Sequence, residues 1–302
     1  MAKKNINAIK KAKSDYVLEW ITGIILVVAF ILVAYPIIYV ISASVSSSAA
    51  LESGLVVLWP VDFSMEAYEF VFNFKQVWTG FRNTIFYTIM DVLIQTTMTL
   101  FVAYPISRKY FGARGFYTFI FFFSTRVSAG MIPTFILKCN LGLFDNIWAV
   151  IIGGSVSVSH VLILRTAITS SVSNDLFDAA RIDGANHFQS IFNVVLPLTK
   201  ATLAVLVFYT ICGQWNEYFT SMLFLRDSRL YPLQLVLRPI MTAATAQSGI
   251  QAGSVGSSEA DGDGLENVRY ALIIITSTPL IALFFAVQKF FKGGVMMGSL
   301  KG

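Results

Sequence analysis

Long hydrophobic stretches separated by shorter polar segments form the main pattern of this chain. A run of about twenty apolar residues is long enough to cross a bilayer as a helix. We therefore predict six transmembrane helices, at about 17–43, 83–107, 115–137, 147–168, 201–223 and 269–287. The expected fold is an all-α polytopic membrane protein, in which a transmembrane domain at 17–291 follows a basic N-terminus at 1–16 and precedes a tail at 292–302.

The composition supports a membrane protein. Hydrophobic residues make up 56% of the chain and charged residues 13%, whereas soluble domains average about 45–50% and about 25%. The net charge of +5 needs no nucleic-acid partner, because its distribution bears on membrane topology instead.

The first apolar run has a basic lead-in and could be taken for a cleaved signal peptide. The run from Val17 to about Ala43 is much longer than the roughly 7–15 residues of a signal-peptide core, and it contains Pro36. We therefore predict a retained first transmembrane helix.

Charge orients the expected helices in the membrane. Basic residues cluster in the N-terminus, in the turn at 108–114, in the segment at 165–200 and in the tail, whereas the acidic segments at 44–82 and 225–268 fall on the other side. Cytoplasmic loops carry the excess of Lys and Arg. Both termini are therefore expected in the cytoplasm.

A polar island at 174–197 interrupts the hydrophobic pattern and has the signals of a helix, a turn and a second helix. Asn174 or Asp175 can cap the first helix, with an acidic group near its positive end. Gly184 supplies a residue that can take the left-handed conformation and end this helix. The island is thus expected to form a knob outside the membrane.

The second helix of the island has its own boundary signals. Asn186 can cap its start. Pro197 disfavours a helical conformation at the preceding Leu196, so the second helix is expected to stop there.

Catalytic motifs are absent from the sequence. It contains no phosphate-binding loop ending in Lys-Ser or Lys-Thr, no His-Glu-x-x-His and no Gly-x-Ser-x-Gly. With only two histidines, His160 and His187, a histidine metal cluster is not expected. We predict that the chain is not an enzyme, binds no metal and obtains energy from another protein.

Several polar residues fall inside the expected helices, where they usually face a cavity or a partner helix. Asp91 and Gln95 are four residues apart and share a helix face. The whole set comprises Asp91, Gln95, Arg126, Gln214, Asn216 and Glu217. They can line a polar path, or they can pair between helices, for instance Asp91 with Arg126. Both interpretations stay open, and pairing is favoured for Asp91.

The polar island carries a recognisable signature. Asp178-Ala179-Ala180 is followed after three residues by Gly184, and after nine more by Val194-Val195-Leu196-Pro197. This spacing resembles the Glu-Ala-Ala signature of ABC importer permeases, with Asp in place of Glu and Val in place of Ile. Asp183 and Ala185 beside Gly184 strengthen the resemblance.

The resemblance extends along the chain to the carbohydrate branch of these permeases. It includes Asn83 before an apolar run, Ala103-Tyr104-Pro105, Ile132-Pro133, Gln214-Trp215-Asn216 and the basic tail from Gln288. The chain is similar to the six-span permease subunit of importers for sugars or oligosaccharides.

This resemblance implies a type I importer bundle in a bacterial cytoplasmic membrane, with a cytoplasmic coupling helix-turn-helix at 174–197 that docks on an ATPase. The implied coupling residues are Asp178, Ala179, Ala180, Asp183, Gly184, Ala185, His187, Leu196 and Pro197. The implied partners are a second homologous permease, two ATPase subunits, an extracytoplasmic sugar-binding protein and the lipid bilayer. ATP and magnesium would be used by the ATPase, and no cofactor would be bound by this chain.

Two other transport functions remain open. One is an ABC permease for a non-sugar solute, and the other is an ion-coupled secondary sugar carrier. The absence of two recognisable inverted repeats argues against the secondary carrier.

Overall fold

The computed structural model describes residues 13–154, 156–247 and 265–298 of the chain. Within these ranges the regular elements are helices, and the one β contact is an isolated bridge between Ser46 and Phe63. The α-helices are α1 (Lys13–Ser44), α2 (Ser48–Glu52), α3 (Glu66–Asn73), α4 (Lys75–Ser107), α5 (Arg114–Arg126), α6 (Met131–Asn140), α7 (Trp148–Ile151), α8 (Val158–Ser171), α9 (Asn174–Ile182), α10 (His187–Ser190), α11 (Leu196–Trp215), α12 (Phe219–Phe224), α13 (Leu233–Gln247) and α14 (Leu265–Gly298). Short 3₁₀ helices η1 (Ile152–Gly154) and η3 (Ser228–Leu230) and a π-helix η2 (Ile191–Val195) complete the set. The all-helical prediction is confirmed.

Two compact units make up the chain, one of residues 1–71 with 243–275 and one of residues 72–242 with 276–302. In the first unit, α1 leaves most of its apolar side chains exposed. At its C-terminal end, Ala43, Ala50 and Val56 form a small core. The Asn267 side-chain amide donates a hydrogen bond to the Ser46 carbonyl at 3.2 Å, which holds the start of α14 in this unit.

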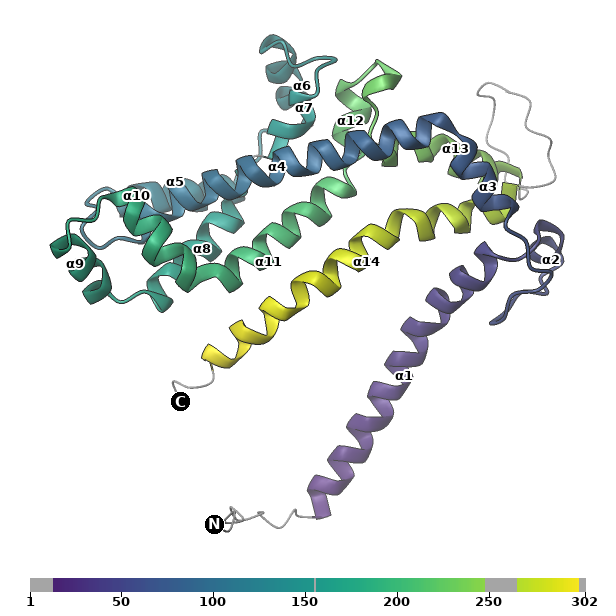
Figure 1. The fold of residues 1–302 in the computed structure, drawn as a ribbon, viewed down its shortest axis with the longest axis horizontal. Coiled ribbons are helices and arrows are strands. Elements are labelled where there is room, and N and C mark those ends of the chain that lie inside the picture. The colour runs from purple at the N-terminus through teal and green to yellow at the C-terminus, as the bar shows by residue number, and fades with distance from the viewer. Residues whose placement is uncertain (1–12, 155, 248–264, 299–302) are drawn as a thin grey trace. The chain divides into compact units, whose positions relative to one another are not determined.

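The second unit is built around α4, α8 and α11, which pack along one another (Figure 1). Their shared core includes Leu100 and Ala103 of α4, Leu164 of α8 and Leu206 of α11. The helices α9 and α10 lie at one end of α4, and α13 lies at the other (Figure 1).

The opposite end of α4 is tied to the chain that enters α13. Leu233 donates its backbone N–H to the Thr84 hydroxyl at 2.8 Å, and the Tyr87 hydroxyl donates to the Leu230 carbonyl at 2.8 Å. The Asn83 side chain donates to the carbonyls of Arg229 and Tyr231. Polar side chains of one helix therefore satisfy the backbone of a loop far away in sequence.

Four described helical segments are long and apolar enough to cross a membrane, namely Asp15–Ser44, Lys75–Ser107, His187–Trp215 and Asn267–Lys289. A fifth candidate is the pair α5 and α6, which meet at 115°. The structure thus has four to five candidate spans.

Some expected helix ranges differ from the structure. The range 115–137 is broken between α5 and α6, where Gly130 has φ +84°, a conformation that glycine adopts without strain. The range 147–168 consists of α7, η1 and the separate α8. The range 201–223 stops at Trp215, and its helical segment already starts at His187.

Candidate functional site

The polar island forms a short helix, a tight turn and a second helix, in the predicted order. The first helix, α9, follows an N-cap at Ser173, so the predicted cap at Asn174 or Asp175 is one or two residues late. At its end Gly184 has φ +79°, and Ala185 donates its N–H to the Ala180 carbonyl at 2.9 Å. This left-handed turn at Gly184 confirms the predicted helix stop.

The second helix starts with the predicted cap. The Asn186 side chain accepts the Gln189 backbone N–H at 2.8 Å, and the Gln189 side chain accepts the Asn186 backbone N–H at 2.8 Å. This reciprocal pair is a capping box, which satisfies two of the N–H groups that a helix start leaves free.

The predicted end of this helix at Leu196 is wrong. Leu196 has helical angles of φ −59° and ψ −46°, and the helix continues without a break from His187 to Trp215. Pro197 lies in the first turn of α11, directly after the π-helical turn η2. A proline removes one N–H from the helical hydrogen-bond ladder, and prolines and single π turns are both common sites of irregularity within continuous helices. The polar island therefore runs directly into a membrane helix.

Aromatic contacts hold the knob against the end of α4. Phe177 of α9 is buried, and the guanidinium carbon of Arg108 lies 3.3 Å from its ring centroid. Tyr104 places its ring 6.1 Å from that of Phe177, and its hydroxyl lies 3.2 Å from Nδ1 of His187. The Phe188 ring meets Phe101 edge-on at 5.8 Å. These contacts join both helices of the knob to one face of α4.

Partial burial lowers the pKa of the Arg108 guanidinium from its usual value, while neighbouring Tyr104 and Asp178 favour the charged form. An arginine still carries its charge at physiological pH because its usual pKa is so high. Arg108 therefore holds a cation over the Phe177 ring and close enough to Asp178 to interact with its carboxylate.

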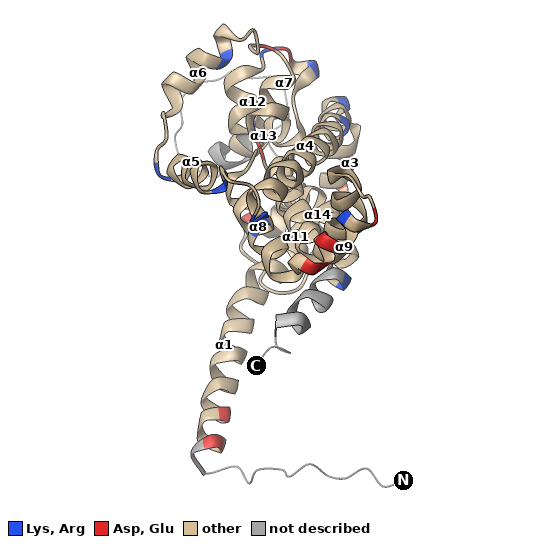
Figure 2. Ribbon diagram, turned by 90° about the vertical axis from the view of Figure 1, so that its left-hand side faces the viewer, with Lys and Arg blue, Asp and Glu red and all other residues tan. Residues whose placement is uncertain are grey.

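Most of the signature residues keep exposed surface. Asp178, Ala179, Asp183 and Gly184 are exposed, and the acidic positions of α9 are marked in Figure 2. Ala180 and Ala185 are half-buried, and His187, Leu196 and Pro197 keep exposed surface.

Some residues of the knob escaped prediction from the sequence. Ile182, next to Asp183, is 86% exposed, and its place between Arg181 and Asp183 was the available signal. The anchors Phe101 and Tyr104 of α4 and Arg108 at its C-cap are spaced by three and four residues, but nothing in the sequence shows which helix they meet.

A family model described as "Binding-protein-dependent transport system inner membrane component" matches residues 77–296 of this chain, which include α4 from its third residue onward and the whole knob. The chain belongs to this family. It is 30% identical over 282 residues to the "Polygalacturonan/rhamnogalacturonan transport system permease protein" YtcP of Bacillus subtilis (strain 168), covering 93% of this chain and 97% of that protein. It is also 26% identical to the "Arabinooligosaccharides transport system permease protein" AraQ of Halalkalibacterium halodurans, covering 97% and 100% of the two chains.

A solved structure supports the same assignment. A chain in the crystal structure of a bacterial ABC transporter involved in the import of the acidic polysaccharide alginate superposes with a TM-score of 0.82 at 32% identity, covering 94% of this chain and 100% of that one. This chain is thus a permease subunit of an ABC transporter, a non-catalytic, multi-pass component of the inner membrane. Membership of a binding-protein-dependent system implies an ATPase and a binding protein as partners. The predicted family and the non-catalytic role are confirmed.

Within the permease, Asp91 and Gln95 share a buried face of α4, at 5% and 7% exposure. Gln95 accepts a hydrogen bond from the Thr210 hydroxyl of α11, so it pairs two helices. Asp91 has an Oδ1 atom that is buried without a hydrogen-bond partner among the described residues.

The pairing of Asp91 with Arg126, given above as one possible example, is not present in the structure. Arg126 is exposed at the end of α5, with its guanidinium 5.4 Å from the Phe122 ring of its own helix. No ion pair joins Asp91 and Arg126, both of which the structure describes. The break between α5 and α6 follows directly after Arg126.

The other polar residues singled out from the sequence, Gln214, Asn216 and Glu217, lie at the C-terminal end of α11. Asn216 donates its side-chain N–H to the Cys212 carbonyl at 2.8 Å, and Glu217 accepts the Thr220 backbone N–H at 2.6 Å. Gln214 is half-buried. Between them, the Trp215 indole N–H donates to the Thr276 carbonyl of α14 at 3.0 Å. Asn216 and Glu217 thus satisfy backbone groups at helix ends, and Trp215 joins two helices.

Proposed function

We propose that this permease forms half of the translocation pathway of an ATP-driven importer for sugars or oligosaccharides, and that the segment 174–197 couples it to an ATPase. One observation carries the proposal. The knob is anchored to α4 through Phe177 and His187, exposes Asp178 and Gly184, and continues without a break into α11.

This arrangement suits a mechanical coupling element. Small residues such as Ala179 and Gly184 let a partner protein approach the backbone closely, and Asp178 can pair with a basic residue of that partner. A displacement of the knob would then move α11 directly and α4 through the aromatic contacts. Closure of the ATPase subunits around ATP could in this way switch the bundle between inward-open and outward-open states.

The proposed arrangement in the membrane has six spans, with both termini and the knob in the cytoplasm. The basic turn at 108–114 supports it, because this turn lies at the same end of α4 as the knob. In this arrangement the bundle is of the type I importer class. A second homologous permease completes the pathway, and two ATPase subunits use ATP and magnesium while this chain binds no cofactor.

The substrate class rests on the relatives. Their names include polygalacturonan, rhamnogalacturonan and arabinooligosaccharides, and the solved transporter imports alginate. Oligogalacturonides and alginate oligosaccharides are therefore the first ligands to test, with a maltodextrin as a neutral comparison. The binding protein delivers the sugar to the extracytoplasmic side.

The experiment is uptake of a labelled oligosaccharide into proteoliposomes that hold the purified complex, with binding protein outside and ATP inside. We expect ATP-dependent uptake that an uncoupler leaves intact. Gly184→Asp should insert normally but lose both ATPase association and uptake. Gly142→Asp is the matched control, since Gly142 has a similar φ of +71° and equally open surroundings outside the knob. Uptake that an uncoupler abolishes and ATP depletion spares would show a secondary carrier instead, and undiminished uptake by Gly184→Asp would overturn the coupling role.

A further inference from the structure

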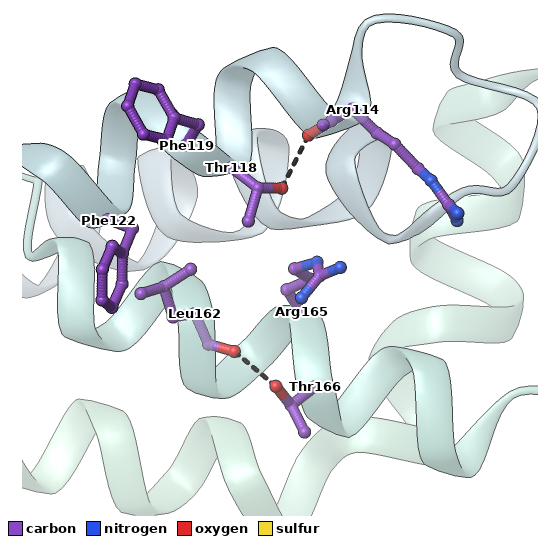
Figure 3. Close-up of a pocket in the computed structure, with 8 residues that line it drawn as sticks. Arg114, Thr118, Phe119, Phe122, Leu162, Arg165 and Thr166 are labelled. Atoms are coloured by element: carbon purple, nitrogen blue, oxygen red, sulfur yellow. Dashed lines mark hydrogen bonds between the residues drawn. The ribbon is translucent and has the colours of Figure 1, made fainter.

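A pocket of about 660 Å³, open to its surroundings rather than enclosed, lies between α5 and α8 and is called the cavity below. Figure 3 shows two arginines, Arg114 and Arg165, toward one end of it and the rings of Phe119 and Phe122 toward the other. Leu162 adds apolar surface between them. The cavity therefore has a cationic end and an apolar end, and its volume falls in the range of about 300–1,000 Å³ that is usual for ligand sites.

The two arginines at the cationic end of the cavity are available to bind an anion. Arg165 donates its Nε–H to the Ile106 carbonyl at 3.3 Å, which orients the guanidinium and leaves its two terminal amino groups available. Arg114 is exposed at the first position of α5. Among the described residues, no carboxylate forms an ion pair with either arginine, and no acidic residue lines the cavity. Two guanidinium groups that line the same cavity and have no counter-charge there favour a bound anion.

The two hydroxyl groups in the cavity do not compete for that anion. The Thr118 hydroxyl donates to the Arg114 carbonyl at 2.6 Å, and the Thr166 hydroxyl donates to the Leu162 carbonyl at 2.9 Å (Figure 3). Both protons are used within their own helices, so the arginines remain the donors for a ligand.

The position of the cavity indicates where the anion comes from. Arg114 follows the turn that ends α4, and Arg165 is bonded to Ile106 at the end of the same helix. In the arrangement proposed above, this is the level of the cytoplasmic lipid headgroups. Basic pockets between membrane helices on that side suit anionic headgroups.

We propose that this cavity binds an anionic phospholipid of the inner leaflet. Arg114 and Arg165 hold the phosphate, and an acyl chain lies along Phe119 and Phe122. This inference rests on the cytoplasmic placement of the knob under the proposed function. A lipid bound there joins α5 to α8 just before the knob, so it makes coupling sensitive to membrane composition.

The test compares the intact transporter in nanodiscs of phosphatidylcholine alone and with added phosphatidylglycerol. Native mass spectrometry counts the retained phosphatidylglycerol, and sugar-stimulated ATP hydrolysis reports coupling. The test variant is Arg114→Gln with Arg165→Gln. The control is Lys109→Gln, which removes one charge from the same basic turn at an exposed residue that does not line the cavity.

We expect a roughly tenfold fall in retained phosphatidylglycerol for the double variant, as the loss of charge-assisted bonds to phosphate predicts. The control should retain the lipid. Stimulation of the wild-type transporter by phosphatidylglycerol should disappear in the double variant, while its activity in phosphatidylcholine stays intact. Arg165→Lys should keep part of the lipid, which separates lost charge from lost folding.

Equal retention by the double variant and the control would overturn the site. Displacement of the lipid by millimolar inorganic phosphate would show that the cavity is a site for soluble anions and not for a lipid. A failure of the proposed function would be recognised separately. Uptake by the wild-type transporter is measured on the same purified protein after its transfer from nanodiscs to liposomes. Intact uptake without a phosphatidylglycerol preference overturns the lipid site alone.

Discussion

The guanidinium carbon of Arg108 lies 3.3 Å from the ring centroid of Phe177. This contact joins the C-cap of α4 to α9, two parts of the chain that are far apart in sequence. An arginine over an aromatic ring contributes about 0.5–2 kcal/mol, with the larger value when the pair is desolvated. Because Phe177 is buried and Asp178 beside it is exposed, α9 has an anchoring face and an outward face. A coupling element needs both.

Phe177→Ala should loosen the knob. Truncating a buried Phe removes its apolar contacts and leaves a cavity, at a typical cost of about 3–5 kcal/mol. We expect faster amide hydrogen exchange across 174–190 and weaker retention of the ATPase, measured by co-purification. Phe116→Ala on the exposed side of α5 is the matched control. Wild-type exchange in the Phe177 variant would contradict the anchoring role.

Substitutions at Gly184 separate backbone strain from contact with a partner. A Cβ at this position meets nothing within 4 Å in this chain, whereas its φ of +79° is unfavourable for other residues. Gly184→Ala should therefore cost about 1–2 kcal/mol locally, and Gly184→Asn less, because Asn tolerates this conformation better. Thermal unfolding and ATPase binding are the measurements.

Gly142→Ala is the control for strain alone, since its φ is +71° and its surroundings are equally open. One result would be that Gly184→Ala and Gly184→Asn lose ATPase binding equally while remaining as stable as the control. That result would show that any side chain at this position blocks the interface with the ATPase. If Gly184→Asn binds the ATPase and Gly184→Ala does not, binding depends on the left-handed backbone turn. Unchanged binding in both variants would show that the turn does not meet the ATPase.

Gln95 and Thr210 should be energetically coupled. Hydrogen bonds between membrane helices contribute about 0.6 kcal/mol on average and up to about 1.7 kcal/mol. Gln95→Leu and Thr210→Val should each destabilise the permease, and the double variant should cost less than the sum of the two, as unfolding in detergent would show. Additive effects would mean that the bond between α4 and α11 does not contribute to stability.

Asp145 should hold the loop that leads to η3. Its Oδ1 accepts the backbone N–H groups of Arg226 at 2.8 Å and Asp227 at 3.1 Å, and these bonds lower the pKa of the Asp145 carboxyl. Asp145 itself has φ +54°. Asp145→Ala should therefore speed hydrogen exchange at 226–231, whereas Asp145→Asn keeps an acceptor and tolerates the backbone conformation.

The pH dependence of this loop follows from the lowered pKa. A carboxyl whose pKa is lower in the folded protein stabilises it above the unfolded pKa of about 3.9, and this contribution is lost as the pH falls through the folded value. Protection of the Arg226 and Asp227 amides, corrected for intrinsic exchange, should hold at neutral pH and fall in acid. Asp145→Asn should show no such fall, and an identical fall in that variant would contradict the assignment.

In the polar island, the sequence predicted those features that depend only on a few neighbouring residues. Gly184 and Asn186 took their expected roles because a left-handed turn and a capping box depend on only a few adjacent groups. The expectation at Leu196 failed because a steric preference between two residues is weaker than the packing of a long helix, in which Leu196 takes helical angles directly after a π turn.

Contacts between helices could not be derived from the sequence. Asp91 with Arg126 was one possible pair, but Arg126 is exposed beside Phe122 of its own helix, whereas Asp91 is buried on α4. Periodicity identifies which residues share a face of one helix, as it did for Asp91 and Gln95, but not which helix that face meets. Thr210 was for this reason not foreseen as the partner of Gln95.

The sequence by itself determined the membrane class, the family, and the position and turn of the knob, because these follow from hydrophobic length, local caps and a spaced signature. Only the tertiary structure decided how the knob is held, through Tyr104, Arg108 and Phe177, and that it is continuous with α11. It also brought Arg114 and Arg165 to one cavity. The reason is that such contacts depend on how helices tilt and rotate against one another, which no local pattern of residues specifies.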